Sequence, residues 1–88
     1  MYKVYLLPAA QKDLDNYGGK IFRQIEARIL DLEKDPRPPG SIKLTAEEGY
    51  RIRSGEYRIV YRIDDDAKIV YVYRIKHRKN VYKRLPQS

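Results

Sequence analysis

Basic side chains that could hold phosphate groups are concentrated in the second half of this chain. Residues 50–88 hold eleven Lys and Arg against four Asp and Glu, whereas residues 1–49 hold eight of each. The whole formal net charge of +7 therefore lies in the second half. Guanidinium groups carry forked N–H donors that match phosphate oxygens. A one-sided basic half of this kind indicates a polyanionic partner, and nucleic acid is the leading candidate.

The C-terminal stretch adds side chains that can move protons. His77 and Tyr82 lie within a run that contains no acid, and its basic members are Arg74, Lys76, Arg78, Lys79, Lys83 and Arg84. RNA cleavage without a metal ion needs a base for the 2′-OH, positive charge for the phosphorane and an acid for the 5′ oxygen. A histidine, a tyrosine and several arginines can supply these three functions. The alternative interpretation is a solvated basic surface, in which His77 is an ordinary polar residue and Tyr82 anchors the tail.

The composition restricts the class of protein. Eighty-eight residues allow one small domain over 1–88. The absence of cysteine and the presence of one histidine argue against a metal centre, so we expect no cofactor. The apolar runs are too short to span a bilayer, and the N-terminus does not resemble a signal peptide. We therefore expect a soluble cytoplasmic protein without a membrane partner.

The pattern of apolar residues and breakers predicts an α+β fold of order β-α-α-β-β-β. An N-terminal strand and a helical hairpin precede a three-stranded antiparallel meander with a short basic tail. Pro8 suits a helix start, Gly18-Gly19 separates the helices, and the proline-rich residues 35–40 end the second one. The predicted strands are residues 2–7, 50–54, 57–63 and 69–75, and the predicted helices are residues 9–17 and 20–34.

Two turns predict which side chains share a face of the sheet. A two-residue turn at Gly55-Glu56 places Arg53 opposite Arg58. A five-residue loop would place Ile63 opposite Ile69 and Arg58 opposite Arg74. One face is then apolar and aromatic and packs under the helices. The other is basic around three valines and carries Arg51, Arg53, Arg58, Arg62, Arg74 and Lys76. Like charges directly opposite each other repel by about 0.2–1 kcal/mol per pair, a cost that an anionic ligand would remove.

Two sequence stretches resemble the RelE/ParE family of bacterial and archaeal toxins. They are GYRIRSGEYRIVYRI over residues 49–63 and HRKNVY over residues 77–82. The N-terminal strand, the helical hairpin and Leu44 in the connector extend the resemblance over nearly the whole chain. It implies a type II toxin with a cognate antitoxin as its partner. The branch that resembles RelE itself cuts mRNA in the ribosomal A site, and the ParE branch inhibits DNA gyrase.

The resemblance also implies roles for particular residues. The catalytic positions of the RelE branch correspond to Arg51, Arg53, Arg58, Arg78 and Tyr82, and His77 lies beside them. The expected RNA-binding residues are Arg62, Arg74, Lys76, Lys79, Lys83 and Arg84. Arginine occupies second-strand positions where the best-known RelE pattern has lysine, so three candidates remain for the general base: His77, Tyr82 and Glu48. The expected function is a ribosome-dependent endoribonuclease, and the alternatives are a gyrase inhibitor and a non-catalytic RNA-binding domain.

Overall fold

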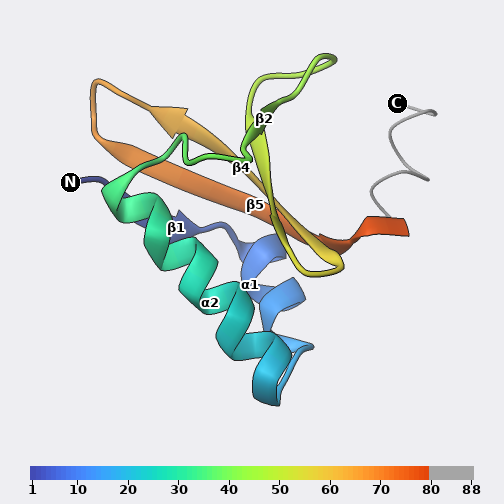
Figure 1. Ribbon diagram of the computed structural model, residues 1–88. Coiled ribbons are helices and arrows are strands. Elements are labelled where there is room, and N and C mark those ends of the chain that lie inside the picture. The colour runs from blue at the N-terminus through green and yellow to red at the C-terminus, as the bar shows by residue number, and fades with distance from the viewer. Residues whose placement is uncertain (80–88) are drawn as a thin grey trace.

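The computed structural model describes residues 1–79 and has the predicted α+β architecture (Figure 1). Its elements are β1 (Lys3–Leu6), α1 (Pro8–Asp15), α2 (Gly19–Lys34), β2 (Ile42–Lys43), β3 (Tyr50–Ser54), β4 (Tyr57–Asp64) and β5 (Ile69–His77). The predicted N-terminal strand, helical hairpin and meander are confirmed. The short strand β2, within the connector, was not predicted.

All five strands form one sheet in the order β1-β5-β4-β3-β2. β1 pairs with β5 in parallel, and the other neighbouring strands are antiparallel. Both helices lie on the same face of the sheet (Figure 1), where their buried side chains join those of the strands in one core. The opposite face carries no helix within residues 1–79, and β3 continues past the two residues that pair with β2.

The helices begin and end where local chemistry dictates. Pro8 opens α1, a position where its fixed φ and missing N–H cost nothing. Gly18 caps α2, whose stripe of Ile25, Ile29 and Leu32 is buried at helical spacing. The helix ends before Pro36, because proline disfavours the α conformation of the residue preceding it.

The hairpin between β3 and β4 has the predicted register. Ser54 lies opposite Tyr57, and Arg53 lies opposite Arg58. Gly55 adopts a φ of +60° in the two-residue turn, a conformation that glycine reaches at no steric cost. This turn fixes which residues of both strands face away from the helices.

The predicted register between β4 and β5 was wrong. Asp64, rather than Ile63, lies opposite Ile69, because the Asp64 carboxylate accepts the N–H of Ala67 and tightens the loop. A β-bulge at Val60/Tyr61 then shifts the pairing by one further residue, so that Arg58 lies opposite Lys76 instead of Arg74.

The new register also changes which side chains of β5 are buried. Val70 and Val72, expected on the basic face, are fully buried in the core. Ile69, Tyr71 and Tyr73, expected under the helices, are only partly buried. Ile75 is buried as predicted, since the bulge restores the original alternation beyond it.

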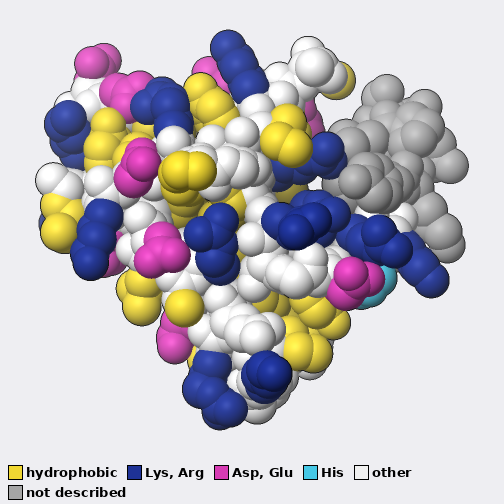
Figure 2. All heavy atoms as spheres, viewed as in Figure 1, with side chains coloured by type: hydrophobic (Ala, Val, Ile, Leu, Met, Phe, Trp, Pro, Cys, Tyr) yellow, Lys and Arg dark blue, Asp and Glu magenta, His cyan; other side chains and the backbone are white. Residues whose placement is uncertain are grey.

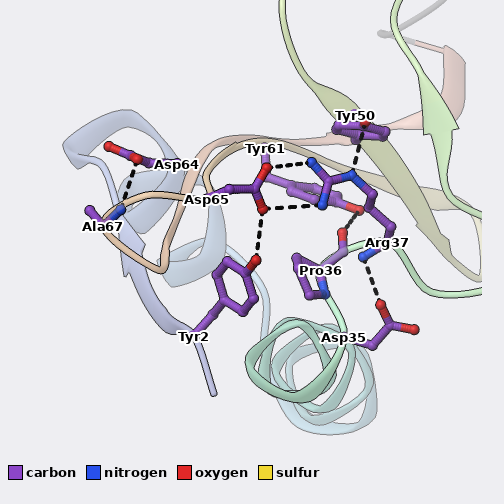
Figure 3. A network of polar contacts seen from close by, with 9 residues as sticks. All are labelled: Tyr2, Asp35, Pro36, Arg37, Tyr50, Tyr61, Asp64, Asp65 and Ala67. Carbon is purple, nitrogen blue, oxygen red and sulfur yellow. Dashed lines mark hydrogen bonds and ion pairs between the residues drawn. The ribbon is translucent and has the colours of Figure 1, made fainter.

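A polar network joins four segments that are distant in the sequence (Figure 3). Arg37 donates from both terminal nitrogens to the Asp65 carboxylate, at 2.8 and 3.2 Å, and from Nε to the Tyr50 hydroxyl at 3.1 Å. The Tyr2 hydroxyl donates to the same carboxylate at 2.7 Å. The hydrogen bonds from Arg37 and Tyr2 lower the pKa of Asp65 to about 2. The network ties the N-terminus and the residues after α2 to the β4–β5 loop.

Candidate nucleic-acid interface

An open pocket of about 530 Å³ lies along β3, at the point where its pairing with β2 ends at Ile42 and Arg51. Its lining consists of Arg28, Gly40, Ile42, Arg51, Arg53 and Arg58. Three of these are sequence-predicted catalytic residues, which the β3–β4 pairing brings to the same face of the sheet. No acidic side chain belongs to this lining. The pocket therefore presents guanidinium groups to an anion.

Arg58 is the most buried of the charged residues in this pocket. It is 9% exposed, and its Nη1 donates to the carbonyl oxygens of Gly55 and Tyr57 at 3.4 and 3.3 Å. Arg53 lies directly opposite on β3 and Lys76 directly opposite on β5. The row of three cations expected across the meander is thus present, with Lys76 in place of Arg74.

His77 and Arg78 lie next to the turn that holds Arg58. His77 is opposite Tyr57, and the two rings pack edge to face with centroids 5.4 Å apart. The Lys79 N–H donates to His77 Nδ1 at 3.2 Å, which orients the imidazole ring. Arg78 forms an ion pair with Glu56 at 3.1 Å, and both side chains are about half exposed. An exposed pair of this kind is worth little and readily exchanges one anion for another.

Figure 2 shows Lys and Arg side chains gathered near the end of β5, with the only histidine and an acidic side chain among them. Lys79 is exposed in this region. Tyr82, Lys83 and Arg84 lie outside the described residues. Within residues 1–79, no three His, Asp or Glu side chains converge as a metal ion would require. No helix in the same range is long and apolar enough to cross a membrane.

Two of the predicted RNA-binding residues lie outside the pocket lining and pair with acids. Arg74 donates to the Asp13 carboxylate from Nε at 2.8 Å and from Nη2 at 3.2 Å. Arg62 lies over the Tyr71 ring and 4.0 Å from the carboxylate of Glu48. The general-base candidate Glu48 therefore belongs to a separate depression, of about 430 Å³, that also contains three aspartates.

Two residues around the site were not identified from sequence. Arg28, on α2, lines the pocket and donates from Nε to the carbonyl oxygen of Arg53 at 3.2 Å. Asp13, on α1, accepts the N–H of Ile75 at 2.9 Å just beyond the point where β1 stops pairing with β5. Each is one charged residue on a largely polar helix surface. No local pattern distinguishes either from its charged neighbours.

The sequence is similar to known toxins over most of its length. Residues 4–82 match the family described as ParE toxin of type II toxin-antitoxin system, parDE. Toxin RelG of Mycobacterium tuberculosis (strain ATCC 25618 / H37Rv) is 31% identical over 85 residues, which cover 94% of this chain and 98% of RelG.

Solved structures of toxins are also similar to this chain. A chain in the toxin–antitoxin complex RelBE2 from Mycobacterium tuberculosis superposes with a TM-score of 0.77 at 29% identity, over 86% of this chain and 96% of that one. A chain in the intact E. coli RelBE toxin–antitoxin complex gives a TM-score of 0.76 at 25% identity, over 88% and 96%. The RelE-like fold expected from the sequence resemblance is confirmed.

Proposed function

Since this chain belongs to the ParE toxin family of type II toxin–antitoxin systems, within the RelE/ParE superfamily, we propose that it cleaves mRNA in the ribosomal A site. The observation that carries the proposal is the convergence of Arg51, Arg53 and Arg58 on one pocket whose lining contains no acid. Inhibition of a protein target such as gyrase would not require guanidinium groups gathered in this way. Phosphodiester cleavage does require them, because negative charge increases on the phosphate in the transition state.

The proposed reaction is an intramolecular transesterification. The 2′ oxygen of the RNA attacks the adjacent phosphorus, and the bond from phosphorus to the 5′ oxygen breaks. The proton of the 2′-OH passes to a base, and the 5′ oxygen receives a proton from an acid. The products are a 2′,3′-cyclic phosphate and a 5′-OH end, and no metal ion takes part.

Each site residue has a role in this scheme. Arg51, Arg53 and Arg58 bind the scissile phosphate and stabilise its added charge. Arg78 joins them by exchanging the Glu56 carboxylate for a phosphate oxygen, which its exposed ion pair permits. The His77 ring and the Tyr82 hydroxyl are the groups that move protons. Lys76, Lys79, Lys83 and Arg84 contribute positive charge along the RNA, and Arg62 and Arg74 contribute less because each is paired with an acid.

A cognate antitoxin is the expected protein partner. The similar structures include toxin–antitoxin complexes, and the arginines of the pocket repel one another when no anion is bound. We propose that acidic residues of an antitoxin cover this face and keep the toxin inactive. Because the targets are the ribosome and mRNA, we place the site of action in the cytoplasm.

The proposal is tested with purified ribosomes programmed with a short 5′-labelled mRNA. The wild-type protein should cut the message in the A-site codon and leave 5′-OH ends. Arg58→Ala should lower the cleavage rate by roughly 10²–10³-fold, the usual effect of losing one transition-state donor. Arg58→Lys keeps the charge but loses the forked donors, so its cleavage rate should lie between those of the wild-type protein and Arg58→Ala.

The matched control is Arg23→Gln, which removes one exposed positive charge from α2 away from the pocket lining. It should cut at the wild-type rate. Circular dichroism of every variant establishes that the fold is retained. Growth arrest by a wild-type toxin that leaves the mRNA intact would contradict the proposal and favour the gyrase alternative.

A further inference from the structure

Arg28 brings a fourth guanidinium group to the pocket from a different structural layer. Arg51, Arg53 and Arg58 come from the sheet, whereas Arg28 comes from α2 on the helical side. The pocket therefore extends from the open face of the sheet to α2, at the point where the pairing of β2 with β3 ends at Ile42 and Arg51. An RNA strand lying on the sheet could reach Arg28 only by crossing this edge.

The Arg28 side chain is held in place but is not fully engaged. Its Nε donates to the carbonyl oxygen of Arg53, and its Nη1 lies 3.5 Å from the Asp31 carboxylate. These contacts use two of the five N–H donors of a guanidinium group. The side chain is 32% exposed, so the remaining donors are accessible to a ligand. The bond to Arg53 links the position of Arg28 to that of a residue in the proposed active site.

The dimensions and charge of the pocket suit more than one phosphate. Its volume of about 530 Å³ lies within the range of about 300–1,000 Å³ typical of ligand sites. Apart from the four arginines, the lining contains only Gly40 and Ile42, which carry no charge. The guanidinium groups come from both the sheet and α2, so together they offer N–H donors to more than one phosphate.

From these observations we propose that Arg28 binds the RNA phosphate next to the scissile one, and that the RNA strand crosses the β3 edge between the sheet and α2. This inference rests on the proposed function and deepens it, because it adds a substrate-binding residue and gives the direction of the RNA path. Arg28 is a binding residue in this scheme and takes no part in proton transfer.

The test measures RNA binding as a function of salt. The probe is a fluorescein-labelled six-nucleotide RNA with 2′-O-methyl groups at every position, which cannot be cleaved because it lacks the attacking hydroxyl. For single strands, log Kobs falls with log[salt] by about 0.7 per phosphate contact. Arg28→Gln should therefore reduce the slope by about 0.7, which corresponds to about five-fold weaker binding at 0.1 M salt and to no difference near 1 M.

Two further variants separate the contact from general effects of charge. Arg23→Gln removes the same charge from an exposed position on α2 and should keep the wild-type slope. Asp31→Asn removes the acid beside Arg28 and should strengthen binding at low salt. Because Asp31 is itself exposed, this variant should fold even if Arg28→Gln does not.

The outcomes distinguish this inference from the proposed function. If the wild-type protein does not bind this RNA, the Arg28 inference is overturned, and the cleavage assay with programmed ribosomes decides the proposed function separately. If the wild-type protein binds with a steep slope but Arg28→Gln behaves like Arg23→Gln, only the Arg28 inference is overturned. If Arg28→Gln leaves the salt dependence of RNA binding unchanged but weakens antitoxin binding, the edge of the pocket binds an acidic protein segment. This result would also overturn the Arg28 inference.

Discussion

Asp13 holds α1 against the part of β5 that leads to His77 and Arg78, and its removal should destabilise the protein measurably. β1 pairs with β5 only as far as Val72. Beyond that point the Asp13 carboxylate accepts the N–H of Ile75 at 2.9 Å and two N–H groups of Arg74 at 2.8 and 3.2 Å. A helix side chain thus replaces a missing strand partner.

The size of the effect follows from the burial of these groups. The Asp13 side chain is 14% exposed, and Ile75 is 1% exposed. An unpaired buried N–H costs about 1–3 kcal/mol, and hydrogen bonds to a charged group contribute about 1.5–3 kcal/mol, less where one partner is exposed as Arg74 is. We expect Asp13→Ala to lower the free energy of unfolding by about 2–3 kcal/mol and Tm by roughly 10–20 °C for a domain of this size. Urea denaturation followed by circular dichroism measures the change in the free energy of unfolding.

The stabilisation should also depend on pH. Burial alone raises the pKa of Asp13, but the hydrogen bonds from Arg74 and Ile75 outweigh burial and leave the pKa below its ordinary value. Because the folded-state pKa is depressed, the contribution is fully present above the unfolded value near ~3.9 and is lost as pH falls through the folded value. The difference between wild type and Asp13→Ala should therefore be constant at neutral pH and shrink in acid.

The control is Asp15→Ala on the same helix. Asp15 is exposed, and within residues 1–79 it accepts only the amide of Gln11, so its loss should change the free energy of unfolding by less than about 0.5 kcal/mol. Equal effects of the Asp13 and Asp15 substitutions would refute the reasoning. So would a difference between wild type and Asp13→Ala that keeps its full size in strong acid.

Three further structural features are tested by substitution or titration. Gly49→Ala should cost more than about 3 kcal/mol, because Gly49 has a φ of +130° and a Cβ there would lie 2.7 Å from the carbonyl oxygen of Tyr61. Gly55→Ala, whose Cβ would meet no atom within 4 Å, should cost only about 1–2 kcal/mol in the same denaturation assay. The Asp65 carboxyl should titrate by NMR at about 2 and at a higher pH in Arg37→Gln, where the Tyr2 hydrogen bond remains, and an unchanged midpoint would contradict the role given to Arg37. Tyr61→Phe should lower stability by about 1 kcal/mol, because the Pro36 carbonyl oxygen loses the hydroxyl that donates to it at 2.7 Å.

The β3–β4 hairpin and the α2 core stripe were predictable because their signals are local. The Gly55 turn fixes the register of its strands, and a helix with apolar residues at spacings of three and four has one buried face. These two features were sufficient to bring Arg51, Arg53 and Arg58 together in the prediction.

The register of β5 was not predictable because its residues do not alternate in polarity. From Ile69 to Tyr73 every side chain is apolar or aromatic, so either face of the strand could pack against the helices. The bulge at Val60/Tyr61 adds a further shift that no turn signals. The pairing of β1 with β5 and the positions of Asp13 and Arg28 depend on contacts between distant segments. The sequence contains no period or breaker that would reveal them.

The measurement that tests the proposed function most directly is primer extension on an abundant mRNA after induced expression of the toxin in a susceptible bacterium. A matched reporter mRNA without its start codon distinguishes translated from untranslated message. We predict cuts within the translated reading frame, none in the untranslated reporter, and none in either when Arg58 is replaced by alanine in a protein that still folds. Growth arrest with both messages intact, or cuts by a folded Arg58→Ala protein, would contradict the proposal that this chain is a ribosome-dependent ribonuclease acting through Arg58.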